Sequence, residues 1–138
     1  MKLSVNQLLV QEASVARNNA YAPYSNYKVG AALLDSEENV YTGCNVENAA
    51  YGSTLCAERG AIMKAISVGS QVFSKIAIVA DTSKAAPWPC GSCRQMLDEF
   101  SPHIELIIAD ASGRIIDETK KLSDIHLYGF SLGSDARG

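Results

Sequence analysis

Three cysteines and one glutamate have the residue types and the spacing that a zinc-dependent enzyme needs. Glu58 follows Cys56 by two positions, and the pair Cys90 and Cys93 comes later in the chain. Three protein ligands leave the fourth coordination position of zinc open for water. A nearby carboxylate can then move the protons of that water. The pattern therefore predicts a zinc site with Glu58 as its proton-transfer group.

Two other interpretations of the cysteines remain open at this stage. A structural zinc site, as in a zinc-stabilised binding module, needs four closed ligands, and Cys44 is the available fourth. Cys44 ends an apolar strand, however, which favours a buried thiol. A redox pair formed by Cys90 and Cys93 is also possible, but it leaves Cys56 and Glu58 without a role.

Three thiolates carry more negative charge than one zinc ion balances, which weakens zinc as a Lewis acid. Cys56 and Cys90 each open a predicted helix, and the N-terminal ends of these helices supply part of the compensation. Arg59 is predicted to supply more by donating to a ligand sulfur. Arg94 is a second candidate for that duty. For both arginines the alternative is a solvated position on a helix surface.

The elements that position these residues can be predicted from periodicity and from breaker residues. Helices are expected at 4–20, 56–67 and 90–100, and strands at 29–34, 40–44, 75–81, 104–110 and from 115 onward. This order predicts an α/β fold, a three-layer α-β-α sandwich with a mixed five-stranded sheet, in a single domain of residues 1–138. Residues 45–55 form a long polar loop, a kind of segment that often carries function.

Composition limits the partners. The 138 residues are 47% hydrophobic and carry a net charge of −3, and the basic residues are scattered. This surface favours a small, nearly neutral ligand over nucleic acid. The chain has no apolar run of the length that a membrane span needs. The polar N-terminus is a poor secretory signal, so a reducing, cytoplasmic location is expected.

The cysteine motifs resemble those of the zinc-dependent nucleoside and nucleotide deaminases. The matching segments are Cys56-Ala-Glu-Arg59 and Pro89-Cys-Gly-Ser-Cys-Arg-Gln95. More narrowly, the chain resembles the short, homotetrameric cytidine deaminases over about residues 12–130. Further segments that match this family are Tyr21–Ser25, Val29–Leu34 and Gly43–Tyr51.

The resemblance implies a role for each of several residues. It assigns one Zn²⁺ per subunit to Cys56, Cys90 and Cys93. Asn45 and Glu47 match the pair that holds the ribose, mainly at its 3′-hydroxyl, and an amide with a carboxylate offers the donors and acceptors that a sugar needs. The remaining substrate contacts that it implies are Tyr27 packing on the pyrimidine, the backbone N–H of Ala57 donating to the base carbonyl, and Tyr51 and Phe130 reaching the site of a neighbouring subunit.

The implied activity is hydrolytic deamination of cytidine and 2′-deoxycytidine to uridine and 2′-deoxyuridine, with release of ammonia, as in pyrimidine salvage. Glu58 would move protons from the activated water to N3 of the ring and then to the departing amino group. The implied assembly is a homotetramer with shared active sites. Two segments depart from the family pattern: Ile125–Phe130 lacks the usual Leu-Leu-Pro, and Pro87-Trp88-Pro89 is unusual. Trp88 is predicted either to form the rim of the pocket or to cover the core.

Overall fold

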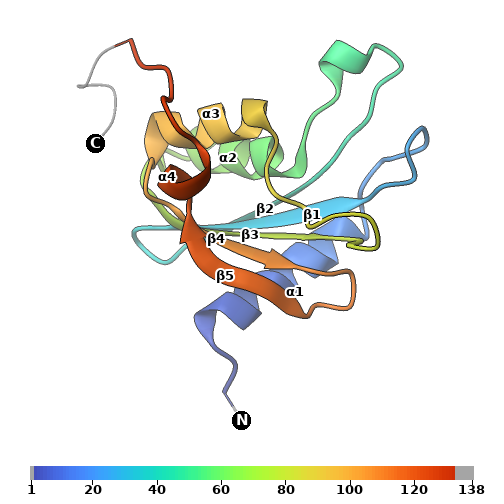
Figure 1. Ribbon diagram of the computed structural model, residues 1–138, viewed down its shortest axis with the longest axis horizontal. Coiled ribbons are helices and arrows are strands. Elements are labelled where there is room, and N and C mark those ends of the chain that lie inside the picture. The colour runs from blue at the N-terminus through green and yellow to red at the C-terminus, as the bar shows by residue number, and fades with distance from the viewer. Residues whose placement is uncertain (1, 133–138) are drawn as a thin grey trace.

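The computed structural model describes residues 2–132 of the chain. Five strands form one mixed sheet with the order β2-β1-β3-β4-β5 (Figure 1). The neighbours β3 and β4 are parallel, and the other three pairs are antiparallel. The strands are β1 Val29–Asp35, β2 Val40–Cys44, β3 Phe73–Ala80, β4 Glu105–Ala109 and β5 Ile115–Lys121.

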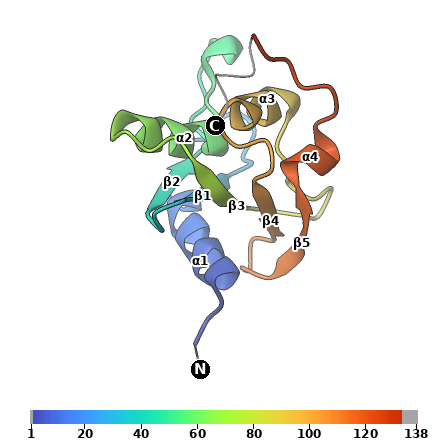
Figure 2. The same ribbon diagram turned by 90° about the vertical axis from the view of Figure 1, so that its left-hand side faces the viewer.

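Helices cover both faces of this sheet. Helix α1 (Val5–Arg17) lies on one face, and α2 (Ala57–Ser67) and α3 (Gly91–Phe100) lie on the other (Figure 2). Two short helical segments complete the described chain, the 3-10 turn η1 (Tyr51–Ser53) and α4 (Leu122–Ile125). The predicted three-layer α-β-α arrangement with a mixed five-stranded sheet is therefore confirmed.

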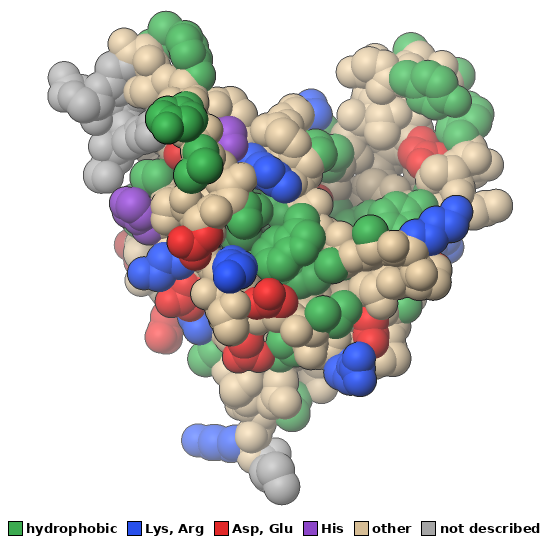
Figure 3. All heavy atoms as spheres, in the orientation of Figure 1, with side chains coloured by type: hydrophobic (Ala, Val, Ile, Leu, Met, Phe, Trp, Pro, Cys, Tyr) green, Lys and Arg blue, Asp and Glu red, His purple; other side chains and the backbone are tan. Residues whose placement is uncertain are grey.

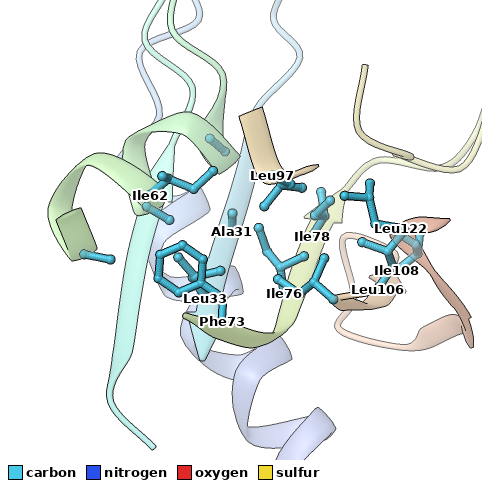
Figure 4. Close-up of a cluster of buried hydrophobic side chains, with 14 residues drawn as sticks. Ala31, Leu33, Ile62, Phe73, Ile76, Ile78, Leu97, Leu106, Ile108 and Leu122 are labelled. Carbon is cyan, nitrogen blue, oxygen red and sulfur yellow. The ribbon is translucent and has the colours of Figure 1, made fainter. Parts of the chain in front are cut away.

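The core is divided between the two faces by the alternation of side chains along the central strands. On β3, Ile76 and Ile78 point toward α2 and α3, whereas Ala77 and Val79 point toward α1. Figure 4 shows the larger of the two clusters, in which Ile62 of α2 and Leu97 of α3 contact the sheet. Both faces of the inner strands are buried, which explains their nearly continuous apolar sequences.

Glycines allow two helices to approach the sheet closely. A Cβ atom at Gly43 of β2 would stand 2.3 Å from the carbonyl oxygen of Ala57, in the first turn of α2. A Cβ atom at Gly30 of β1 would stand 1.9 Å from the carbonyl oxygen of Ala13 in α1. The close contact at Gly43 fixes the position of the N-terminus of α2, where Cys56 lies.

Most predicted boundaries agree with the structure within a few residues. Ser4 caps α1 with a capping box, in which Gln7 N donates to Ser4 Oγ at 3.2 Å. The helix ends at Arg17, before the predicted residue 20. Strand β5 is longer than expected, because its polar residues lie on an exposed edge. The turn η1 and helix α4 are too short to give a helical period.

The single domain predicted for residues 1–138 includes positions 1 and 133–138, which lie outside the described residues. Within residues 2–132, no helix combines the length and the apolar character needed to cross a membrane.

Candidate active site

The three predicted zinc ligands lie together at the N-terminal ends of two helices. Cys56 is the N-cap of α2, Cys90 is the N-cap of α3, and Cys93 lies in the first turn of α3. Their Sγ atoms all lie within 4.8 Å of one another. Sulfur atoms around a tetrahedral zinc, with Zn–S bonds of about 2.3 Å, are roughly 3.8 Å apart. The cluster is therefore compact enough to hold one zinc ion.

Both N-cap cysteines have extended backbone conformations, with ψ of 155° for Cys56 and 169° for Cys90. An extended N-cap residue directs its side chain over the first turn of the helix, where the N–H groups lack intrahelical partners. This geometry explains how Glu58 can lie beside Cys56 although residues two apart on a regular helix point to different sides. The predicted position of Cys56, at the start of the helix and not inside it, is confirmed.

The cluster favours a thiolate at Cys56. A hydrogen bond from the Cys93 thiol is the largest influence that lowers the pKa of Cys56 to about 6. Burial opposes this shift, while the Cys90 thiol and the charge of Arg59 add to it. The same sulfur–sulfur contact, together with burial, raises the pKa of Cys93. Arg59 therefore acts electrostatically on one ligand, in the direction that charge compensation requires.

Glu58 lies in the first turn of α2 and is only 5% exposed. Burial is the main cause that raises the pKa of its carboxyl group to about 7, and the negative charge of Cys56 contributes. A carboxyl group that titrates near neutral pH can both accept and donate a proton at that pH.

A cavity of about 320 Å³ opens next to the sulfur cluster. Its wall includes Cys56, Ala57 and Glu58 from the start of α2, and Tyr27 and Asn45 from the facing loops. This volume falls in the range of small-molecule sites. Ala57 is the first residue of α2, so its N–H has no partner within the helix and can serve a ligand in the cavity. Five predicted site residues are thus brought together here.

Asn45, which directly follows β2, holds the segment between Tyr27 and Val29. Its Oδ1 accepts from Val29 N at 2.8 Å, and its Nδ2 donates to the Tyr27 carbonyl oxygen at 2.8 Å. These bonds tie the segment that enters β1 to the residue that follows β2. An amide oxygen can accept a second hydrogen bond and an amide nitrogen can donate a second one, so Asn45 keeps capacity for a ligand.

Glu47 is oriented differently from Asn45 and does not line this cavity. Its Oε1 accepts from Tyr24 N at 3.0 Å and from Ser25 N at 3.1 Å, and its Oε2 accepts from the Ser25 hydroxyl. These hydrogen bonds, that from the hydroxyl first, hold the pKa of Glu47 below its ordinary value. Glu47 therefore orders the turn that precedes Tyr27.

Tyr51 and Phe130 lie outside the cavity, on two projections of the molecule. Tyr51 belongs to the η1 loop and is 79% exposed, and Phe130 lies in the C-terminal segment and is 67% exposed. The η1 loop and the C-terminal segment both project above the layer of α2 and α3, on opposite sides of the view (Figure 1). In the space-filling view these projections stand on either side of a hollow (Figure 3). One chain alone does not bring these two aromatic residues to the cavity.

The structure also decides several open points. Among the described residues the metal-binding cluster contains Cys56, Cys90 and Cys93 without Cys44, which argues against the four-cysteine structural site. Trp88 both lines the cavity and packs against the core, so its two predicted roles coexist. Thr54 and Leu55 also line the cavity. Nothing in their residue types marks them in the sequence, because only the loop path brings them there.

Comparison with known proteins agrees with this geometry. Residues 3–109 match the family described as the cytidine and deoxycytidylate deaminase zinc-binding region. A cytidine deaminase of Halalkalibacterium halodurans is 52% identical over 96 residues, which cover 70% of this chain and 72% of the relative. A cytidine deaminase of Sporosarcina psychrophila is 51% identical over 92 residues, 67% of each chain.

The solved structures extend the likeness to the whole fold. The crystal structure of cytidine deaminase from Burkholderia pseudomallei superposes on this chain with a TM-score of 0.84 at 39% identity. The superposition covers 92% of this chain and 100% of the other chain. The fold and the three-sulfur site are those of a zinc-dependent deaminase. The chain belongs to the cytidine and deoxycytidylate deaminase family, and Cys56, Cys90 and Cys93 fit one zinc ion per subunit.

Proposed function

We propose that this protein catalyses the hydrolytic deamination of cytidine and 2′-deoxycytidine to uridine and 2′-deoxyuridine, with release of ammonia. The observation that carries the proposal is the buried Glu58 carboxyl group in the wall of a nucleoside-sized cavity, beside the three-sulfur cluster. The cytidine deaminases that share about half of their aligned residues with this chain support the same substrate class.

Proton transfer is the task of Glu58. When bound, zinc supplies Lewis-acid chemistry that lowers the pKa of a water molecule. Glu58 would accept a proton from the water and deliver it to N3 of the pyrimidine, which makes C4 electrophilic, so that the water oxygen bonds to C4. Glu58 would then carry the remaining proton of that oxygen to the amino group, which leaves as ammonia when the C4–N4 bond breaks. Its raised pKa, about 7, suits both directions of transfer.

Four residues orient the substrate in this proposal. The Ala57 N–H donates to the base carbonyl, the Tyr27 ring packs on the pyrimidine, and Asn45 binds the ribose. Glu47 reaches the ribose only with lone pairs that its bonds to the Tyr24–Ser25 turn leave available. We therefore assign Glu47 two duties, sugar binding and support of the segment that carries Tyr27.

Two other activities use the same chemistry on different substrates. Deamination of a free base would not need the Asn45 and Glu47 sugar contacts, whereas deamination of a nucleoside antibiotic would still use them. Editing of single-stranded nucleic acid would be opposed by the net charge of −3. Competition between cytidine, cytosine, an aminopyrimidine nucleoside antibiotic and a single-stranded oligonucleotide separates these activities. We expect cytidine to have the largest kcat/KM.

The central test is Glu58→Ala. General acid–base catalysis contributes about 10²- to 10⁴-fold, so we expect kcat to fall by about that factor. The zinc content should remain near one per chain, because Glu58 is not a ligand in this proposal. Loss of the cytidine amino group is followed by absorbance, and zinc by elemental analysis. Glu12→Ala is the matched control, because Glu12 is exposed on α1, which lies on the opposite face of the sheet from Glu58. Activity within tenfold of wild type would remove the assigned role from Glu58.

The assembly proposed here is a homotetramer with shared active sites. The exposed rings of Tyr51 and Phe130 and the exposed Cys90 support it, because a neighbouring subunit would cover them. We place the protein in the cytoplasm, where a reducing environment keeps the ligand thiols free to bind metal.

A further inference from the structure

Arg94 connects the zinc-ligand loop to the C-terminal part of the chain. It directly follows the ligand Cys93 on α3 and is half-buried. Its Nε donates to the carbonyl oxygen of Pro89 at 2.7 Å, and its Nη1 donates to the carbonyl oxygen of Ile125 at 2.9 Å. Pro89 immediately precedes the ligand Cys90, and Ile125 ends α4. One planar guanidinium group thus bridges two segments that are distant in the sequence.

The Pro89 carbonyl needs this donor. Pro89 is buried, and a buried carbonyl group without a hydrogen bond is costly. The nearby bond from Trp88 N to the Ala86 carbonyl oxygen is a local turn contact, which does not attach the loop to α3. The Cys90 carbonyl oxygen accepts from Arg94 N at 2.8 Å within the helix start, and the bond from the guanidinium group to Pro89 adds a second attachment on the preceding residue. Arg94 therefore holds the backbone on both sides of the Pro89–Cys90 peptide bond.

The next residue on α3, Gln95, holds the C-terminal segment by its backbone. Its Nε2 donates to the Phe130 carbonyl oxygen at 2.8 Å, and its Oε1 accepts from Phe130 N at 3.1 Å. The His126 ring approaches the same Oε1, with its Nε2 at 3.2 Å. This paired contact resembles one step of strand pairing and fixes the direction of residues 126–130.

The backbone of this segment is shaped to lie close to α3. Tyr128 has a φ of +56°, a left-handed conformation that turns the chain back toward the helix. At the next position a Cβ atom on Gly129 would stand 2.6 Å from Asp98 Oδ2 and 2.9 Å from the His126 ring. A side chain at this position would have to displace the ends of the Asp98 and His126 side chains. Glycine therefore favours this contact, in a segment that lies beyond residues 3–109, the range of the family match.

We propose that Arg94 is a positioning residue that couples the docked C-terminal segment to the zinc-ligand loop, with Gln95 as the residue that keeps the segment docked. Docking of residues 126–130 on α3 restrains Ile125, Ile125 restrains the Arg94 guanidinium group, and Arg94 restrains the Pro89–Cys90 backbone. The retention of zinc thus depends on contacts made by residues 126–130. This inference rests on the zinc site but not on the substrate proposed above.

The test measures zinc release from the holoenzyme to an excess of a colour-forming chelator, in the absence of nucleoside. Arg94→Lys keeps the charge but replaces the fork with a single ammonium group, which cannot hold both carbonyl groups. Outer contacts of metal ligands change metal affinity by about 10- to 100-fold, so we expect about tenfold faster release. Gln95→Ala should accelerate release about threefold, through a loosened segment.

The double variant distinguishes coupling from general loosening. If residues 126–130 act through Arg94, the double variant with Gln95→Ala and Arg94→Lys should release zinc at the same rate as Arg94→Lys alone. Independent, multiplying effects would overturn the proposal, as would release from Arg94→Lys within twofold of wild type. Tyr128→Asn is the matched control, because Tyr128 is fully exposed and asparagine tolerates its backbone conformation. If Arg94→Lys does not fold by circular dichroism, Gln95→Ala alone decides, and an unchanged rate overturns the coupling. The zinc-release rates are measured without substrate, so they remain informative even if the protein does not deaminate cytidine.

Discussion

At the scale of single residues, the site combines a carboxyl group with a raised pKa and a thiol with a lowered one. Glu58 titrates near 7 because it is buried next to negative charge, and Cys56 near 6 because other groups stabilise its anion. Each shift suits its residue for the task assigned to it above, the proposed proton transfer for Glu58 and metal binding for Cys56.

Arg59 allows this electrostatic argument to be tested directly. Its charge is one of the influences that lower the pKa of Cys56. A thiol must lose its proton to bind zinc, so removal of that charge should move zinc binding to higher pH. For Arg59→Gln we expect zinc affinity at pH 6 to fall about tenfold, with a smaller loss at pH 8. Competition with a chelator of known affinity measures both values.

Arg59→Lys is the appropriate control, because it keeps the charge at the same position. It should bind zinc nearly as the wild type does, with the same dependence on pH. An equal loss of affinity at pH 6 and pH 8 in Arg59→Gln would contradict an electrostatic role and would indicate loss of packing.

At the scale of elements, the helices that carry the ligands could be predicted from the sequence, because their chemistry is local. The spacing of Cys56 and Glu58 alone implies that Cys56 lies at the start of a helix. The loops could not be predicted in the same way. Glu47 turns toward Tyr24 and Ser25 through bonds between residues more than 20 positions apart, and such bonds leave no period in the sequence. The predicted helices therefore locate the zinc ligands, but periodicity does not locate the proposed sugar contacts.

The turn between β1 and β2 depends on a buried carboxylate that the sequence does not mark as special. Asp35 is 3% exposed and accepts from Glu37 N, Asn39 N and the Ser70 hydroxyl at 2.8 to 2.9 Å. Burial alone would raise the pKa of Asp35, but these hydrogen bonds outweigh it, and the pKa lies below its ordinary value. The folded state therefore favours the ionised form.

This shift predicts how stability depends on pH. Because the pKa of Asp35 is lower in the folded state than in the unfolded state, its contribution is complete above about pH 4 and is lost as the pH falls further. Asp35→Asn places an N–H donor opposite the Asn39 side-chain nitrogen, which is itself a donor. We therefore expect the free energy of unfolding to fall by about 1–3 kcal/mol at pH 7. The difference from wild type should shrink below pH 4. Urea unfolding at several pH values measures it.

Glu37→Gln, an exposed change in the same turn, is the control and should be neutral within about 0.5 kcal/mol. A wild-type advantage over Asp35→Asn that stays constant from pH 7 to pH 3 would show that the carboxylate charge is not the source of the stability.

At the scale of the whole molecule, the two projections that carry Tyr51 and Phe130 need an explanation. Their aromatic rings are exposed on one chain, although burial of such rings is strongly favourable. A tetramer in which each projection enters a neighbour's site would bury them. The expected species has four copies of the 14.8 kDa chain, about 59 kDa, in sedimentation at micromolar concentration. A monomer at that concentration would contradict the shared site.

Sharing itself, as distinct from assembly, can be tested by mixing two damaged chains. A Glu58→Ala chain lacks the proton-transfer group but has an intact Phe130, and a Phe130→Ala chain has the reverse defects. If Phe130 acts within its own subunit, a mixture refolded together has the mean activity of the two separate pools. If it acts in a neighbour's site, random assembly gives about a quarter of the sites both intact residues. Activity would then rise above that mean toward a quarter of the wild-type value. The rise requires exchange of subunits, so the same chains mixed without unfolding should show no rise. If the refolded mixture also has only the mean activity of the two separate pools, Phe130 acts within its own subunit.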